Sequence, residues 1–212
     1  TAVSFSDGQR TLRQVGMDEF WPAENDGGCP PEVMVRLLLT KRNRFYIHAV
    51  LARNEVWRRL GPLDEVLVAD WIWSIRACAL APVQLSPRPL LNYRQHDSQT
   101  TAQADRAWLW GLELVRATRL LDRWWTKEPP PIPNARGLLA RTFTLKLLVE
   151  ALHKGQAGDR AGGLFYARLA RTVAPRWVWR VFCAGCEAVL SVLGRRPLTW
   201  LTPVERRFES SW

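Results

Sequence analysis

The sequence predicts a helix-rich α/β chain in two regions, a mixed helix-and-strand region over residues 1–101 and an all-helical region over residues 102–212. Two observations support this division. In the first region, short apolar segments alternate with Gly, Pro, Asn and Asp, which is the pattern of short strands joined by turns. After His96, apolar residues recur every three to four positions over long segments, which is typical of amphipathic helices.

The composition indicates a folded protein with a basic surface. Hydrophobic residues make up 47% of the 212 residues and charged residues 24%, so the chain can bury a core and disorder is not expected. There are 30 Lys and Arg against 20 Asp and Glu, which favours an anionic partner: nucleotide phosphates, nucleic acid or an acidic membrane surface. Twelve Trp, some beside Arg, also fit a membrane–water interface. Nucleic acid is the least favoured partner, because the arginines are scattered and no recognisable module holds them.

The four cysteines predict buried thiols. Cys183 and Cys186 form the one close pair, but they lie in an apolar helical segment with no second pair and no nearby His, which disfavours zinc. A redox pair would normally follow a strand. We therefore expect a reducing compartment, namely the cytoplasm, with a peripheral position at the inner face of the membrane as the second choice. No run of 18 apolar residues occurs in the sequence.

In the first region, turn residues and periodicity predict strands at 3–6, 45–51, 83–85 and 90–93, and helices at 32–39, 54–60 and 70–80. Gly61-Pro62 ends the second of these helices and Pro82 ends the third. The prolines at 87 and 89 exclude a central ladder position for the residues between the last two strands.

In the second region, helices are expected at 104–125, 136–153, from Asp159 to before Pro175, and at 177–193. Asp159 is a suitable N-cap, and residues 129–133 form a stiff polyproline connector. The last helix has one narrow polar stripe, made by Arg176, Arg180, Glu187, Ser191 and Arg195. Two interpretations stay open: a helix lying in a membrane interface, or a bundle helix with one solvated edge.

Polar residues at the ends of predicted elements are the candidates for chemistry. Asp70 opens a predicted helix, where it is either an N-cap or a general base that accepts a proton from an acceptor hydroxyl. Arg94 and His96 follow a predicted strand, where they either bind phosphate and a divalent metal or form ordinary surface contacts. His48 lies in an apolar strand and is more typical of a core, and His153 is expected to cap a helix end.

Motifs in the first hundred residues stand in a definite order: Ser4-Phe5-Ser6-Asp7-Gly8, Arg53-Asn54-Glu55, Leu60-Gly61-Pro62-Leu63-Asp64-Glu65, Ala69-Asp70-Trp71, Arg76, and Pro89-Leu90-Leu91-Asn92-Tyr93-Arg94-Gln95-His96. In this order and spacing they resemble the second half of a family-2 glycosyltransferase, an inverting enzyme of the GT-A fold. The resemblance covers about residues 3 to 100. It implies that the mixed region is a partial GT-A-like sheet segment, the acceptor-side half of the domain, and that residues 102–212 are its helical C-terminal region.

The resemblance implies that Asp70 is the catalytic base in transfer of a sugar from a nucleotide-sugar donor to an acceptor hydroxyl. It places Arg94 and His96 at the diphosphate, Trp71 and His48 at the substrate, and His96 as a metal ligand. A divalent metal, Mg²⁺ or Mn²⁺, would neutralise the leaving diphosphate. The acceptor would be a glycan, a lipid-linked molecule or a protein, as in polysaccharide biosynthesis.

Two departures from the family pattern bear on these expectations. Ala69 stands where many relatives have an acidic residue, and no Asp-x-Asp occurs in the 212 residues. We therefore expect the nucleotide-binding half to be missing, so that this is a truncated, membrane-associated transferase, inactive as it stands. The alternative function is a non-enzymatic basic helical module that binds a membrane surface or a protein partner.

Overall fold

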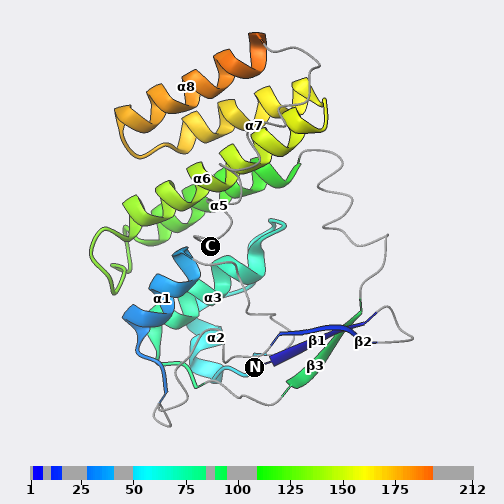
Figure 1. Cartoon of the computed structure of the whole chain (residues 1–212). Coiled ribbons are helices and arrows are strands. Elements are labelled where there is room, and N and C mark those ends of the chain that lie inside the picture. The colour runs from blue at the N-terminus through cyan, green and yellow to red at the C-terminus, as the bar shows by residue number, and fades with distance from the viewer. Residues whose placement is uncertain are drawn as a thin grey trace. The chain divides into compact units, whose positions relative to one another are not determined.

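The computed structural model describes residues 2–6, 11–15, 28–40, 50–84, 89–94 and 109–192, and these contain seven helices and three strands (Figure 1). The chain forms two compact units: Thr1–Arg106 with Pro129–Pro133, and Ala107–Glu128 with Asn134–Trp212. The predicted helix-rich character is confirmed. The predicted boundary between residues 101 and 102 lies outside the described residues.

Three helices form the core of the first unit: α1 (Pro31–Thr40), α2 (Asn54–Leu60) and α3 (Ala69–Leu80). Both α1 and α2 pack against α3. The three helices match the predicted ones to within one residue at each end, because Pro, Gly and the apolar period are local signals. Their buried apolar residues are Met34, Val35, Leu38, Leu39, Trp71, Ile72, Trp73, Ile75 and Cys78.

Gly61 ends α2 in the left-handed region, with φ of 73°, where a residue other than glycine would be strained. Its backbone N–H donates to the carbonyl oxygen of Trp57 and closes the last turn. The turn predicted at Gly61-Pro62 is therefore confirmed at Gly61.

The strands of the first unit are β1 (Ala2–Ser6), β2 (Thr11–Val15) and β3 (Pro89–Arg94), in the order β2-β1-β3. β1 pairs with β2 antiparallel and with β3 parallel, and Ser6 lies opposite Arg94 in the parallel pair. Two of these strands were predicted. Pro89 begins β3, a position that tolerates the missing N–H.

The predicted strands and the observed ones differ at three places. β2 was not predicted, although the Asp-Gly turn after β1 is a hairpin signal that could have found it. Of the strand predicted at 83–85, Val83 makes an isolated antiparallel bridge to Cys29, residue 84 is not in a strand, and residue 85 lies outside the described residues. Of the strand predicted at 45–51, residues 45–49 lie outside the described residues, and residues 50 and 51 are not in a strand.

Four helices make up the described part of the second unit: α5 (Leu109–Trp124), α6 (Ala135–Gln156), α7 (Arg160–Val173) and α8 (Trp177–Val192). Figure 1 shows α7 between α6 and α8, and α5 also contacts α6 and α7. The core residues include Leu114, Leu121, Leu139, Phe143, Leu147, Tyr166, Ala167 and Ala170.

Asp159 is the N-cap of α7, as predicted, because its Oδ1 accepts the backbone N–H of Gly162 at 2.9 Å. The N-terminal part of α7 lies close to α6. A Cβ at Gly163 would lie 3.0 Å from the carbonyl oxygen of Ala151, so glycine permits this approach. Among the described residues, no helix has both the length and the apolar character needed to cross a membrane.

The two helical glycines Gly111 and Gly185 give opposite predictions for stability. A Cβ at Gly111 would lie 2.7 Å from the Tyr166 ring, which is completely buried, whereas a Cβ at Gly185 has no atom within 4 Å. We expect Gly111→Ala to lower the free energy of unfolding by about 1–2 kcal/mol through overpacking. Gly185→Ala should raise it by about 0.5–1 kcal/mol, because alanine has the higher helix propensity.

Urea denaturation followed by circular dichroism measures both changes. Equal effects of the two substitutions would contradict the close approach of α5 and α7.

Candidate functional site

Asp70 lies in the first turn of α3, not at its N-cap, which is Val68. The N-cap interpretation is wrong because the helical bonding begins earlier: the N–H groups of Trp71 and Ile72 both donate to the carbonyl oxygen of Val68 at 3.1 Å. The Asp70 side chain is half-buried, and its Oδ1 accepts the backbone N–H of Trp71 at 2.7 Å. A carboxylate in this position is stabilised by the positive end of the helix dipole.

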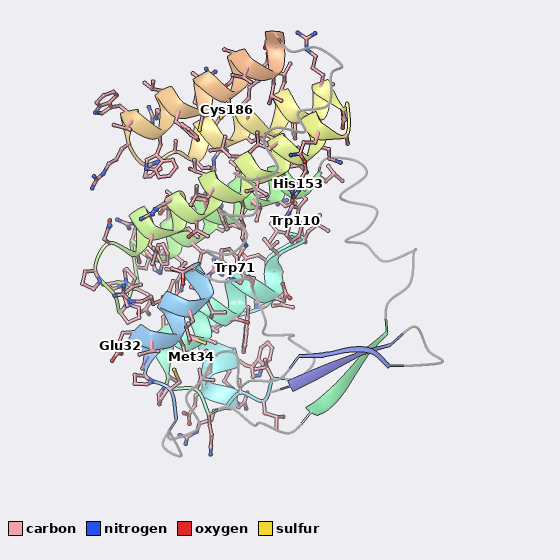
Figure 2. The ribbon with its side chains drawn as sticks, viewed as in Figure 1. Glu32, Met34, Trp71, Trp110, His153 and Cys186 are labelled. Carbon is pink, nitrogen blue, oxygen red and sulfur yellow. The ribbon has the colours of Figure 1, made fainter. Side chains whose placement is uncertain are left out.

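Trp71 fixes the position of α3 against α1. Its side chain is 4% exposed, and its indole N–H donates to the carbonyl oxygen of Leu38, close to the C-terminal end of α1, at 3.0 Å (Figure 2). Trp71 is therefore a core residue that holds its neighbour Asp70. A side-chain hydrogen bond also restrains the first turn of α3, because Ser74 Oγ donates to the Asp70 carbonyl oxygen at 2.7 Å.

An ion pair holds the segment before α3 onto the helix. Arg76 Nη1 lies 2.7 Å from Asp64 Oδ2, and the two side chains are only 12% and 24% exposed. The pair links the residues between α2 and α3 to the second half of α3. Both residues belong to the family-2-like motifs, but the sequence did not predict this ion pair. The two residues are twelve positions apart across a turn, and no local sequence pattern indicates a contact at that separation.

A second contact joins α2 to the same helix. The rings of Trp57 and Trp73 lie 4.2 Å apart between centroids, tilted by 31°. The abundance of Trp suggested a membrane interface, yet Trp71, Trp73 and Trp125 are buried in the core, where a large apolar ring contributes most. These three Trp residues therefore contribute to the core and not to an exposed interface.

Of the other site residues predicted from the sequence, the structure describes only the backbone pairing of Arg94, and His48 and His96 lie outside the described residues. Tyr93 and Arg94 lie on β3, where Arg94 is at the end of the strand opposite Ser6 of β1. His153 lies in the last turn of α6, in the second unit, and its carbonyl oxygen accepts the backbone N–H of Ala157.

The part of the chain that the structure describes contains no group of three or more His, Cys, Asp or Glu side chains that could hold a metal ion. The divalent metal that the resemblance implies therefore has no ligand set among these residues.

The thiols are protected by burial. Cys29, Cys78 and Cys183 are buried and Cys186 is partly exposed, and all four are free. Burial raises the pKa of Cys78 to about 12, with a smaller contribution from the neighbouring Cys29 thiol. Burial also raises the pKa of Cys183 to about 11, with the Cys186 and Glu187 charges adding to the effect. These shifts keep the thiols protonated and unreactive near neutral pH.

The raised pKa of Cys78 predicts a loss of stability at alkaline pH. An unfolded thiol ionises near pH ~8.5, whereas the folded one stays neutral up to about 12, so the unfolded state loses protons first. The free energy of unfolding should fall with rising pH above about 9, with Cys78 contributing on the order of 1 kcal/mol per pH unit. Urea denaturation at several pH values measures the slope, and Cys78→Ala should flatten it; an unchanged slope contradicts the burial of this thiol.

The Arg76–Asp64 pair predicts an energetic coupling. Arg76→Met or Asp64→Asn should each lower the free energy of unfolding by about 1–3 kcal/mol, because each removes one charge of a partly buried ion pair. The double variant should cost less than the sum of the two, with a coupling energy of about 1–2 kcal/mol. Urea denaturation of all four proteins measures the cycle, and additive losses would show that the pair contributes nothing.

Comparison with known proteins found no match: no family model, no curated protein and no solved structure is similar to this chain.

Proposed function

We propose that this chain provides the acceptor side of an inverting glycosyl transfer from a nucleotide-sugar donor, with Asp70 as the general base. The observation that carries the proposal is the position of Asp70: a half-buried carboxylate in the first turn of α3, within the ordered motifs that resemble a family-2 glycosyltransferase. The surrounding contacts support it, because they hold the backbone on both sides of Asp70.

A general base must be held within hydrogen-bond reach of the hydroxyl that it deprotonates. The core position of Trp71 and the bond from Ser74 Oγ to the Asp70 carbonyl oxygen restrict the backbone of Asp70. The Arg76–Asp64 ion pair restrains the segment that leads into the helix. Such restraint lowers the cost of orienting the carboxylate in the transition state.

The proposed step is a single displacement. The acceptor oxygen attacks the anomeric carbon as its proton passes to the Asp70 carboxylate, and the bond from that carbon to the diphosphate oxygen breaks. The diphosphate leaves with the bonding electron pair. Because attack and departure are on opposite sides, the configuration at the anomeric carbon inverts.

The parallel pairing of β1 and β3 supports a polar site at one edge of the sheet. The carboxyl ends of parallel strands lie at the same edge, where ligands commonly bind in α/β proteins. Ser6 and Arg94, the last residues of the two strands, stand opposite each other there. We assign diphosphate binding to Arg94 and His96, and substrate contact to His48. Mg²⁺ or Mn²⁺ stays an expectation from the resemblance alone.

The decisive experiment is a transfer assay with Asp70→Asn. The assay uses the protein encoded by the complete gene, because the Asp-x-Asp motif expected of a donor site does not occur within these 212 residues. Asn keeps the size of the side chain but cannot accept the proton, so kcat should fall by at least about 10²–10⁴-fold. Product release from a panel of nucleotide sugars measures the rate.

The matched control is Glu65→Gln, which removes a nearby exposed carboxylate from the same group of motifs. It should retain near-normal kcat, and both variants should unfold at the same urea concentration as the parent. Transfer that survives Asp70→Asn, or that falls equally with Glu65→Gln, would contradict the role of Asp70.

A further inference from the structure

The helix α8 packs on α7 through a narrow face. Cys183 and Leu190 are buried on this face. Glu187 also points toward α7, where its carboxylate lies 3.8 Å from Arg168 Nε and 3.5 Å from Arg171 Nε. The single acidic residue of α8 is thus neutralised at the contact with α7.

The opposite side of α8 exposes apolar residues. We call this surface the outer face of α8, and its large side chains, with their exposed fractions, are Trp177 (74%), Val178 (54%), Val181 (61%), Phe182 (50%) and Val189 (39%). Their spacing places them on one side of the helix over more than three turns. Of the described polar-stripe residues, Arg176, Arg180 and Ser191 are exposed and Glu187 is turned toward α7, so α8 exposes this stripe together with the apolar outer face.

The exposed charged residues in the described part of α8 and at the position just before it are positive. They lie on the polar stripe, which borders the outer face where Arg180 follows Trp177 by three positions. Arg176, just before the helix, and Arg180 in its first turn are exposed, and the one carboxylate is paired with α7. The whole chain carries a formal net charge of +10. This surface therefore favours an anionic, apolar counterpart and disfavours a second copy of the same basic chain.

We propose that the outer face of α8 docks on an anionic membrane surface. An amphipathic helix of this kind lies in the plane of the membrane, with its apolar side chains in the boundary between headgroups and acyl chains. Trp177 suits that boundary, because its ring is amphipathic. Arg176 and Arg180 would lie at the headgroup phosphates. At 16 residues, α8 is shorter than the roughly 20 residues of a spanning helix. The inference rests on α8 alone and is independent of the proposed transfer reaction.

Vesicle flotation tests the proposal with the complete 212-residue chain. We expect the chain to float with vesicles of phosphatidylcholine and phosphatidylglycerol, and much less with phosphatidylcholine alone. The double substitution Val181→Glu and Phe182→Glu should lower the partition coefficient at least about tenfold, because it removes about two half-exposed apolar side chains from the interface.

The matched control is the double substitution Leu109→Glu and Leu112→Glu on α5, whose side chains are similarly exposed, at 46% and 44%. It adds the same two charges elsewhere in the second unit and should leave flotation within about threefold of the parent. Equal loss in the two double variants would overturn the assignment to α8, since it would report net charge alone.

A second variant tests the charge. Arg176→Gln with Arg180→Gln should weaken binding about fivefold for each arginine removed, without changing the apolar surface. Absence of flotation in the parent, equal binding to neutral vesicles, or no effect of either α8 variant would overturn the proposal. Light scattering without lipid measures whether the chain dimerises. A dimer that the α8 substitutions dissociate would show that the outer face of α8 binds a second copy of the chain and not a membrane.

Discussion

The hydrogen bond from the Trp71 indole to the Leu38 carbonyl oxygen is the contact on which the arrangement of the first unit depends. A buried indole N–H without a partner would cost about 1–3 kcal/mol, so the bond strongly favours one orientation of α3 against α1. Successive helical residues are separated by about 100°. Once Trp71 is buried, Asp70 comes to the edge of the helix interface, where it is half-buried.

The second unit is organised around α7, which is flanked by α6 and α8. Glu187 favours the observed orientation of α8 on α7, because its carboxylate lies near two arginines there and would move away from both if the helix rotated. Burial of Cys183 and Leu190 favours the same orientation. The consequence is that several large apolar residues face outward, which is unfavourable in water unless another surface covers them.

The two units therefore suggest different kinds of chemistry. Around Asp70, restraint of the backbone by Trp71, Ser74 and the Arg76–Asp64 pair suits a group that must be positioned accurately. On α8, Glu187 is held at the contact with α7, and the notable property of the remaining surface is apolar area beside positive charge. The first arrangement favours catalysis and the second favours adhesion to a surface.

The sequence by itself determined the helices and most of their ends, because caps, glycines and prolines act on their nearest neighbours. Gly61 and Asp159 are examples, and the motif order that singled out Asp70 is also a property of the sequence alone. Only the tertiary structure decided which faces are buried. The meeting of Arg76 with Asp64, the core position of Trp71 and the inward turn of Glu187 each depend on packing between segments distant in sequence, and a local pattern carries no information about such a partner.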